Sequence, residues 1–153
     1  MALIGSVLRD AALKLGSRLE AEVLLSFVLD EPRAWLYAHG TSRINHREQR
    51  AFERMLERRC RGEPIAYILG YREFYGREFI VNPSVLIPRP ETELVVDLVL
   101  AHVRATAAQV VDVGTGSGCI ALTLAAERPT WEITALDQSA EALEACSANA
   151  SAL

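Results

Sequence analysis

A glycine-rich segment between two apolar runs constrains the fold of this chain more than any other feature. Three of the four residues at 110–113 are valine, and residues 114–118, read GTGSG, interrupt this β-branched run. The following residues, 119–128, are mostly apolar, and Pro129 ends them. A β-branched run, a glycine turn and an apolar helix are typical of the first half of a parallel α/β unit.

The turn, together with an acid further along the chain, predicts a binding site for an adenosine cofactor. Glycine lets the backbone bend sharply and leaves room for a ligand, and the free N–H groups at a helix start attract a carboxylate or phosphate. A second predicted strand, Glu132–Leu136, ends at Asp137, 19 residues after Gly118. An acid at this place can accept hydrogen bonds from both ribose hydroxyls.

The spacing of the glycines distinguishes between adenosine cofactors. A dinucleotide-binding turn follows G-x-G-x-x-G, but here Cys119 holds the third position and Gly118 comes one residue early. Asp112 also precedes the first glycine by two residues, where a carboxylate would repel a pyrophosphate and attract an ammonium group. The pattern D-x-G-x-G-x-G resembles motif I of the class I S-adenosylmethionine-dependent methyltransferases. The alternative is a glycine turn that only joins a strand to a helix.

Composition indicates a globular protein with two differently charged parts. The net charge is −4, but residues 1–62 hold 11 Lys and Arg against 8 Asp and Glu, whereas residues 63–153 hold 5 against 12. A net charge of +3 in the first part is too small to indicate nucleic-acid binding, and the acidic second part argues against a nucleic-acid substrate.

Cysteine and histidine usage predicts neither disulfides nor a metal site. Cys60, Cys119 and Cys146 share no close spacing, and the three histidines are scattered. We find no signal-peptide pattern and no apolar run near the ~18 residues of a membrane helix. We therefore expect a soluble, cytoplasmic protein with no membrane contact.

Residues 1–70 are predicted to form an all-helical bundle. Ser17 and Asn45 are predicted N-caps, the second of a long helix that runs to Arg61, and residues 65–69 form a short helix. Arginines and glutamates along the long helix favour i,i+4 pairing on a solvated face. A docking face for an acidic or RNA-bound partner is the alternative.

Residues 71–90 are predicted to form a β-hairpin linker, with its turn at Gly76 and Arg77, followed by an extended proline-rich stretch. A helix follows, for which we expect a buried face formed by the apolar residues Leu94, Val95, Leu98 and Val99. Residues 91–153 would then form the α/β part.

Four segments, in this order, resemble the peptide chain release factor glutamine methyltransferases of bacteria and organelles. They are GEPIAYILG at 62–70, REFYGREF at 72–79, LIPRPETE at 86–93 and DVGTGSG at 112–118. The resemblance covers essentially all 153 residues. It implies an α/β protein with a release-factor-binding helical bundle (1–70), a β-hairpin linker (71–90) and the first βαβα portion of a Rossmann-like methyltransferase sheet (91–153).

The resemblance also implies an activity and a site. The family transfers a methyl group from S-adenosylmethionine to the side-chain amide nitrogen of the glutamine in the Gly-Gly-Gln loop of release factors. By this likeness Asp137 binds the ribose, and the cofactor's methionine end is held by Asp112, Gly114, Thr115, Gly116, Ser117 and Gly118. The pocket border would consist of Arg89, Pro90, Glu91 and Thr92, for which a rigid helix start without ligand contact is the alternative.

The catalytic loop of this family, Asn-Pro-Pro-Tyr, does not occur in the sequence. The one Asn-Pro pair, Asn82-Pro83, lies before the glycine turn and is followed by Ser84. We therefore assign no catalytic residue and expect this polypeptide alone to transfer little or no methyl group. The alternatives are a non-catalytic module that binds a release factor or regulates an intact enzyme, and a methyltransferase with another protein or a nucleic acid as substrate.

Overall fold

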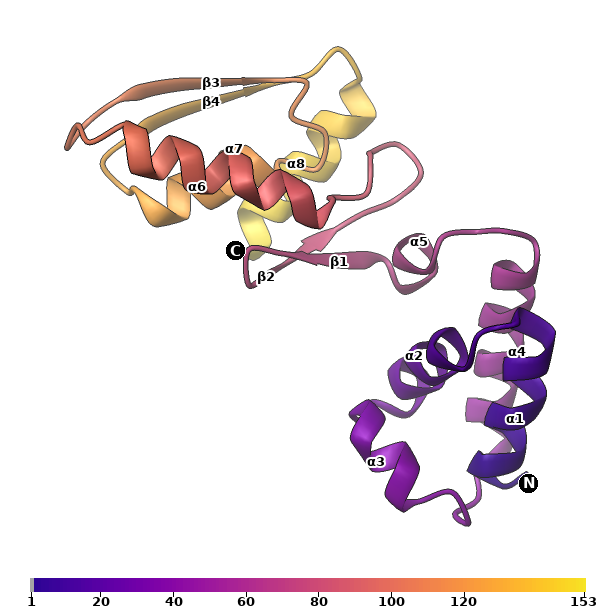
Figure 1. Cartoon of the computed structure of the whole chain (residues 1–153). Helices are drawn as coiled ribbons and strands as arrows, with labels where there is room; N and C mark the ends of the chain where they lie inside the picture. The colour runs from indigo at the N-terminus through magenta and orange to yellow at the C-terminus, as the bar shows by residue number, and fades with distance from the viewer. Residues whose placement is uncertain (1) are drawn as a thin grey trace. The chain divides into compact units, whose positions relative to one another are not determined.

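The computed structural model describes residues 2–153 and divides the chain into two compact units, with the boundary between Leu69 and Gly70 (Figure 1). Within residues 2–153, no helix has both the length and the apolar character needed to cross a membrane.

The first unit is a helical bundle. Its core contains Leu24, Leu25 and Phe52, each at most 1% exposed. The Ser17 hydroxyl accepts a hydrogen bond from the Glu20 N–H, and Asn45 forms a capping box with Glu48, so both predicted N-caps are confirmed. The helices are α1 (Ile4–Leu15), α2 (Arg18–Leu29), α3 (Arg33–Ala38), α4 (His46–Cys60) and α5 (Ile65–Leu69).

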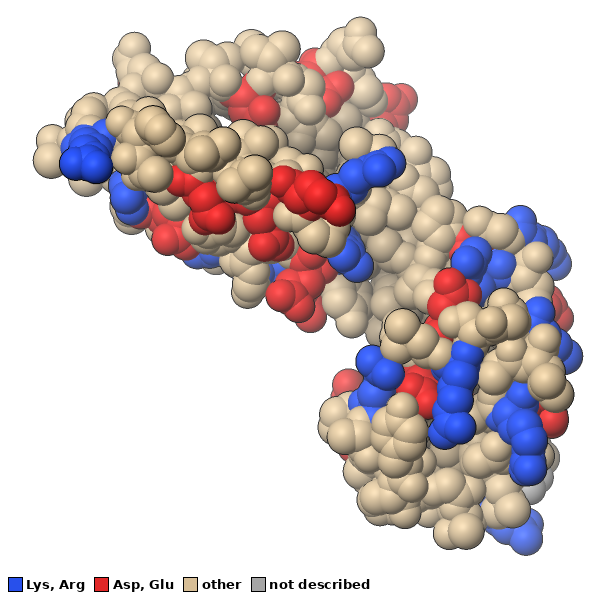
Figure 2. Space-filling view, viewed as in Figure 1, with Lys and Arg blue, Asp and Glu red and all other residues tan. Residues whose placement is uncertain are grey.

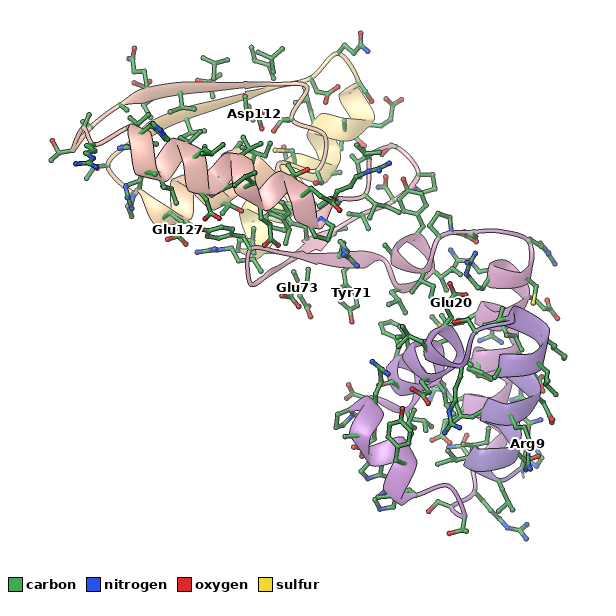
Figure 3. All side chains as sticks on the ribbon, in the orientation of Figure 1. Arg9, Glu20, Tyr71, Glu73, Asp112 and Glu127 are labelled. Atoms are coloured by element: carbon green, nitrogen blue, oxygen red, sulfur yellow. The ribbon has the colours of Figure 1, made fainter. Side chains whose placement is uncertain are left out.

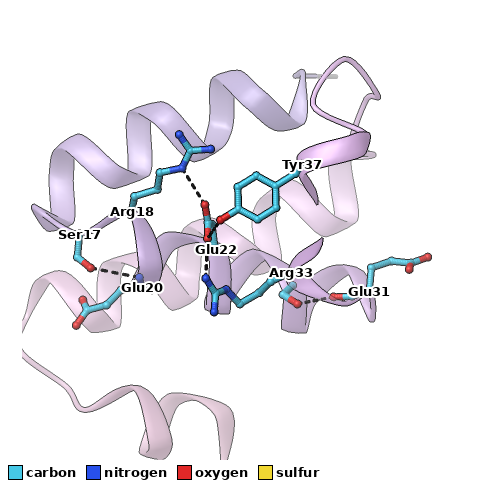
Figure 4. A network of polar contacts seen from close by, with 8 residues as sticks. Ser17, Arg18, Glu20, Glu22, Glu31, Arg33 and Tyr37 are labelled. Carbon is cyan, nitrogen blue, oxygen red and sulfur yellow. Dashed lines mark hydrogen bonds and ion pairs between the residues drawn. The ribbon is translucent and has the colours of Figure 1, made fainter. Parts of the chain in front are cut away.

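A buried carboxylate joins α2 to α3 (Figure 4). Glu22 is 2% exposed and accepts hydrogen bonds from Arg18 Nε (2.8 Å), Arg33 Nη2 (3.0 Å) and the Tyr37 hydroxyl (2.8 Å). Burial alone would raise the pKa of Glu22, but these three donors outweigh it and hold the pKa below its ordinary value. The charge is therefore paired within the bundle, where an unpaired one would be costly.

Arginines at the C-terminal end of α4, and Arg61 just after it, are also paired with acids, but in more exposed positions. Arg59 makes a two-pronged contact with Glu20 of α2, with both distances 2.9 Å. Arg58 pairs with Glu63 (2.6 Å), and Arg61 lies 3.8 Å from Glu57 one turn away. Arg58, Arg59 and Arg61 therefore all have acidic partners within the first unit.

The second unit begins with a β-hairpin, formed by β1 (Tyr71–Phe74) and β2 (Arg77–Ile80). The turn residues are Tyr75 (φ 53°) and Gly76 (φ 71°). The predicted turn at Gly76 and Arg77 was therefore one residue too late, because a two-residue hairpin turn of this type needs two successive positive φ angles.

The α/β part of the second unit confirms the predicted fold class. Strands β3 (Gln109–Val113) and β4 (Glu132–Leu136) pair in parallel, with Val110 opposite Ile133. Figure 1 shows the helices on one side of this strand pair. The other elements are the 3₁₀ turn η1 (Pro90–Thr92) and the helices α6 (Glu93–His102), α7 (Cys119–Glu127) and α8 (Ala140–Ala152).

The buried face of α6 differs in part from the one predicted, because Val99 packs against the core as expected but the other three predicted residues are exposed. Val96 is fully buried, whereas Leu94, Val95 and Leu98 are 59%, 44% and 49% exposed. Helix α6 is apolar on more than one side, so periodicity could not select the face. Long-range contacts select it, because Val96 and Val99 pack with the hairpin phenylalanines and α7.

Polar contacts also fix the hairpin to the helices of the second unit. Glu93 accepts a hydrogen bond from the Tyr75 N–H (2.9 Å), and Arg77 pairs with Glu127 of α7 (2.8 Å). On the face seen in Figure 2, acidic side chains are prominent over the second unit and basic ones over the helical unit.

Candidate functional site

The glycine turn lies between β3 and α7, as predicted, and is fixed to the end of β4. The N–H groups of Gly114 and Thr115 both donate to the carbonyl oxygen of Leu136, at 2.8 and 2.9 Å. The Gly118 N–H donates to the carbonyl oxygen of Thr115 (2.9 Å). These bonds place the turn at the carboxyl ends of both parallel strands, where open α/β sheets bind their ligands.

The three glycines of the turn serve two different purposes. All have positive φ, at 79°, 57° and 81° for Gly114, Gly116 and Gly118. A Cβ built on Gly114 or Gly116 meets no atom within 4 Å, so a ligand can approach the backbone there. A Cβ on Gly118 would lie 2.6 Å from Cys146 Sγ, so this glycine permits close packing of α7 against α8.

Asp112 braces the turn from within β3. Its Oδ2 accepts a hydrogen bond from the Thr115 hydroxyl (2.7 Å), and Thr115 is 6% exposed. Figure 3 shows the Asp112 side chain beneath the strand pair, on the side that the helices cover. The carboxylate has further acceptor capacity, so it can also interact with an ammonium group bound nearby.

Asp137 is held in place by two backbone N–H groups. Its Oδ2 accepts from the Gly116 N–H (2.9 Å) and its Oδ1 from the Ser139 N–H (3.0 Å). These bonds hold the pKa of Asp137 below its ordinary value, and the bond from Ser139 has the larger effect. The side chain is therefore a carboxylate at neutral pH, which only accepts hydrogen bonds. Each oxygen keeps a second lone pair. The residue is therefore oriented and still able to accept two ribose hydroxyls.

The Ser117 hydroxyl is buried without a regular partner. Ser117 is 2% exposed, and its Oγ forms no hydrogen bond with the oxygen or nitrogen atoms of residues 2–153. The thiol of the neighbouring Cys119 offers at most a weak interaction. Buried hydroxyls are nearly always hydrogen-bonded, so a free hydroxyl in the turn fits a site that a polar ligand completes.

A second unpartnered hydroxyl, on Thr123 of α7, provides a matched comparison. Thr123 is fully buried and lies within α7, outside residues 114–118. We expect Thr123→Val to raise the free energy of unfolding by about 1 kcal/mol, because an unsatisfied hydroxyl is removed. Ser117→Ala also removes an unsatisfied hydroxyl and should raise the free energy of unfolding in the same direction, but it should weaken binding of S-adenosylhomocysteine by roughly threefold to tenfold, the value of one hydrogen bond.

Thermal unfolding and calorimetric titration of both variants measure these effects. Thr123→Val is the control for binding and should bind the ligand as the wild type does. Loss of affinity in both variants, or in neither, would contradict the assignment of Ser117 to the ligand.

The predicted pocket-border residues lie at the start of α6. Arg89, Pro90 and Glu91 are exposed and Thr92 is half-buried. The Thr92 N–H donates to the Arg89 carbonyl oxygen (3.0 Å), which closes the 3₁₀ turn. Within residues 2–153, no hydrogen bond or ion pair joins these four residues to the glycine turn.

Sequence reasoning missed Asn149, which is fully buried on α8. Its Nδ2 donates to the carbonyl oxygens of Ser117 (2.9 Å) and Ile80 (3.0 Å), and its Oδ1 accepts from the Ile80 N–H (2.6 Å). The available signal was its place in the buried stripe of α8, where it continues the series Ala142, Ala145 and Cys146.

Comparison with known proteins assigns both parts of the chain. Residues 6–70 match the family model described as PrmC N-terminal domain, and residues 91–153 match the one described as Methyltransferase small domain. Proteins named release factor glutamine methyltransferase are similar over most of the chain. The one from Koribacter versatilis is 50% identical over 137 residues, which cover 89% of this chain and 49% of that protein.

Two further relatives carry the same name. The Bordetella pertussis protein is 45% identical over 154 residues, or 100% of this chain and 56% of that protein. The Coxiella burnetii protein is 46% identical over 134 residues, or 87% and 48%. The chain thus spans about half the length of the curated relatives it matches. The two domain matches and these identities show that the chain resembles the N-terminal part of the release factor glutamine methyltransferases.

Proposed function

We propose that this chain forms the cofactor-binding and substrate-docking part of an S-adenosylmethionine-dependent enzyme that methylates the Gly-Gly-Gln glutamine of peptide chain release factors. The observation that carries the cofactor assignment is Asp137, a backbone-oriented carboxylate beside two glycines that face open space. When bound, the cofactor supplies an electrophilic sulfonium methyl group.

The residues of this chain bind the cofactor and thereby orient its methyl group. Asp137 would accept the ribose hydroxyls, and N–H groups at the start of α7 would bind the methionine carboxylate. The Ser117 hydroxyl gains the partner that it lacks, and Asp112 attracts the ammonium group. These contacts fix the cofactor through its non-reacting parts.

Methylation of an amide nitrogen also requires groups that position the substrate. The amide lone pair is delocalised into its carbonyl, so catalysis depends on orientation and on acceptors for the NH₂ group. The family's Asn-Pro-Pro-Tyr loop has no counterpart in the 153 residues. We propose that these residues bind the cofactor but do not by themselves catalyse methyl transfer.

The test combines calorimetry with a transfer assay. S-adenosylhomocysteine should bind the chain at one site, and labelled S-adenosylmethionine should transfer no methyl group to a release factor. A full-length relative should methylate that factor, but not a variant with the Gly-Gly-Gln glutamine replaced by asparagine. Absence of binding would overturn the cofactor assignment and favour a non-catalytic module, and stoichiometric methylation by the chain would overturn its proposed inactivity.

For docking of the release factor, we propose a cavity in the helical unit. It has a volume of about 790 Å³, and its lining includes the apolar residues Leu8, Ala12 and Leu36. Its charged lining residues are Arg9 and Arg18; Arg18 is paired with Glu22 (2.8 Å), so Arg9 carries the argument for an acidic ligand. Such a site suits a segment of the release factor that carries apolar and acidic side chains.

Reversing the charge of Arg9 tests this surface. We expect Arg9→Glu to weaken binding of a release factor by roughly threefold to tenfold at low salt, with the difference shrinking as ionic strength rises. Arg50→Glu on α4 makes the same charge change on an exposed residue outside the cavity lining, and is the control. Equal loss in both variants would show a general charge effect and contradict docking at the cavity.

A further inference from the structure

We propose that Asn149 is the positioning residue of the cofactor turn. It holds the peptide between Ser117 and Gly118 in one orientation and couples that peptide to β2 of the hairpin. The inference rests on the proposed function in that residues 114–118 are taken to bind the cofactor.

The peptide between Ser117 and Gly118 is held at both ends. Its carbonyl oxygen accepts from Asn149 Nδ2 (2.9 Å), and its N–H donates to the Thr115 carbonyl oxygen (2.9 Å). Glycine tolerates both signs of φ, so Gly118 alone does not prevent this peptide from rotating. Among residues 2–153, Asn149 provides the side chain that fixes the direction of the Ser117 carbonyl group.

The rest of the Asn149 amide pairs with the edge of β2. Ile80 donates its N–H to Asn149 Oδ1 (2.6 Å) and accepts from Nδ2 at its carbonyl oxygen (3.0 Å). The next residue, Val81, donates its N–H to Gly70 on the β1 side (3.0 Å). Because neighbouring backbone groups alternate in direction, those of Ile80 face away from β1 and toward α8. The amide thus serves as a partner for the strand edge.

Burial makes these contacts specific. Asn149 is fully buried and Ser117 is 2% exposed, so water does not substitute for either. The three bonds use both amide hydrogens and the amide oxygen. The other buried positions of α8 hold alanine and cysteine, which are sufficient for packing. An amide is needed because the same side chain forms hydrogen bonds with two backbone segments, at Ser117 and Ile80, which lie 32 and 69 residues away in the chain.

Replacement of Asn149 by aspartate tests the proposal. Asn149→Asp preserves the size of the side chain and the acceptor for the Ile80 N–H, but it removes both donors. The control, Trp131→Phe, deletes the indole N–H bond to the Ala105 carbonyl oxygen (3.2 Å) in the same unit. Hydrogen exchange of the Gly118 amide is measured without ligand, and affinity for S-adenosylhomocysteine is measured by calorimetry.

We expect Asn149→Asp to accelerate exchange at Gly118 and to weaken binding, each by at least about tenfold. Trp131→Phe should leave the exchange rate at Gly118 and the ligand affinity within about twofold of the wild type, even if it lowers the melting temperature as much as Asn149→Asp does. Unchanged exchange in Asn149→Asp, or the same changes in Trp131→Phe, would show that Asn149 only stabilises the fold.

A second measurement requires no substitution. In the wild type, S-adenosylhomocysteine should slow exchange at the Ile80 amide and the Asn149 side-chain amide together with the Gly118 amide. Slower exchange at Gly118 alone would contradict the coupling. If the wild type bound no ligand, the proposed function would fail, whereas the ligand-free exchange at Gly118 would still decide the role of Asn149.

Discussion

Replacement of Gly118 by alanine is expected to destabilise the second unit strongly. The new Cβ would lie 2.6 Å from Cys146 Sγ and 3.0 Å from Leu122 Cδ1, at a φ of 81°. A side chain at positive φ costs about 1–2 kcal/mol, and overpacking costs about 1–3 kcal/mol more. Thermal unfolding should therefore show a loss of roughly 2–5 kcal/mol in the free energy of unfolding.

Two further variants separate backbone strain from the steric clash. Gly76 also has positive φ, but a Cβ there meets no atom within 4 Å, so Gly76→Ala should lose only about 1–2 kcal/mol. Combining Gly118→Ala with Cys146→Ala removes the nearest clashing atom. The double variant should be more stable than the sum of the single effects by about 1 kcal/mol. If the stability losses of the two single variants simply added in the double variant, the packing role of Gly118 would be contradicted.

Asp137→Asn is expected to produce the largest loss of cofactor affinity. An amide cannot accept at both positions, so the bond from either Gly116 or Ser139 is lost with the charge. Charged acceptors contribute more than neutral ones, and we expect affinity for S-adenosylhomocysteine to fall by about tenfold to a hundredfold. Asp97→Asn is the control, because this α6 carboxylate accepts from the Tyr75 hydroxyl and lies outside the proposed site. Equal affinities of the two variants would contradict the ribose assignment.

The pH dependence of binding offers an independent check on Asp137. Its pKa is lowered in the folded chain, so the carboxylate is charged above that lowered value and loses its charge as the pH falls through it. Calorimetry should therefore give a constant affinity from about pH 8 down to about pH 5. A marked fall within that range would show that another group controls binding.

Local signals in the sequence were sufficient to predict most elements and part of the candidate site. Ser17 and Asn45 cap their helices because an N-cap depends on its own helix start. Strand β4 occupies the predicted residues, and Asp137 follows it directly. A glycine turn after a β-branched run likewise depends on neighbouring residues, which explains its prediction at 114–118.

Contacts between segments far apart in the chain could not be predicted from such local signals. The predicted buried face of α6 was correct at Val99 but omitted Val96, because the hairpin and α7 select the buried side and the local pattern contains neither. Asn149 was missed because its place in the buried stripe of α8 indicates burial but not its partners, Ser117 and Ile80, which lie 32 and 69 residues away. The orphaned Ser117 hydroxyl also becomes visible only when all its neighbours are placed.

A crystal structure of the chain with S-adenosylhomocysteine tests the central claim most directly. The account predicts both ribose hydroxyls within hydrogen-bonding distance of the Asp137 carboxylate and the amino-acid end of the ligand against the backbone of residues 114–118. A ligand bound elsewhere, with Asp137 in contact only with solvent and its two backbone donors, would contradict it.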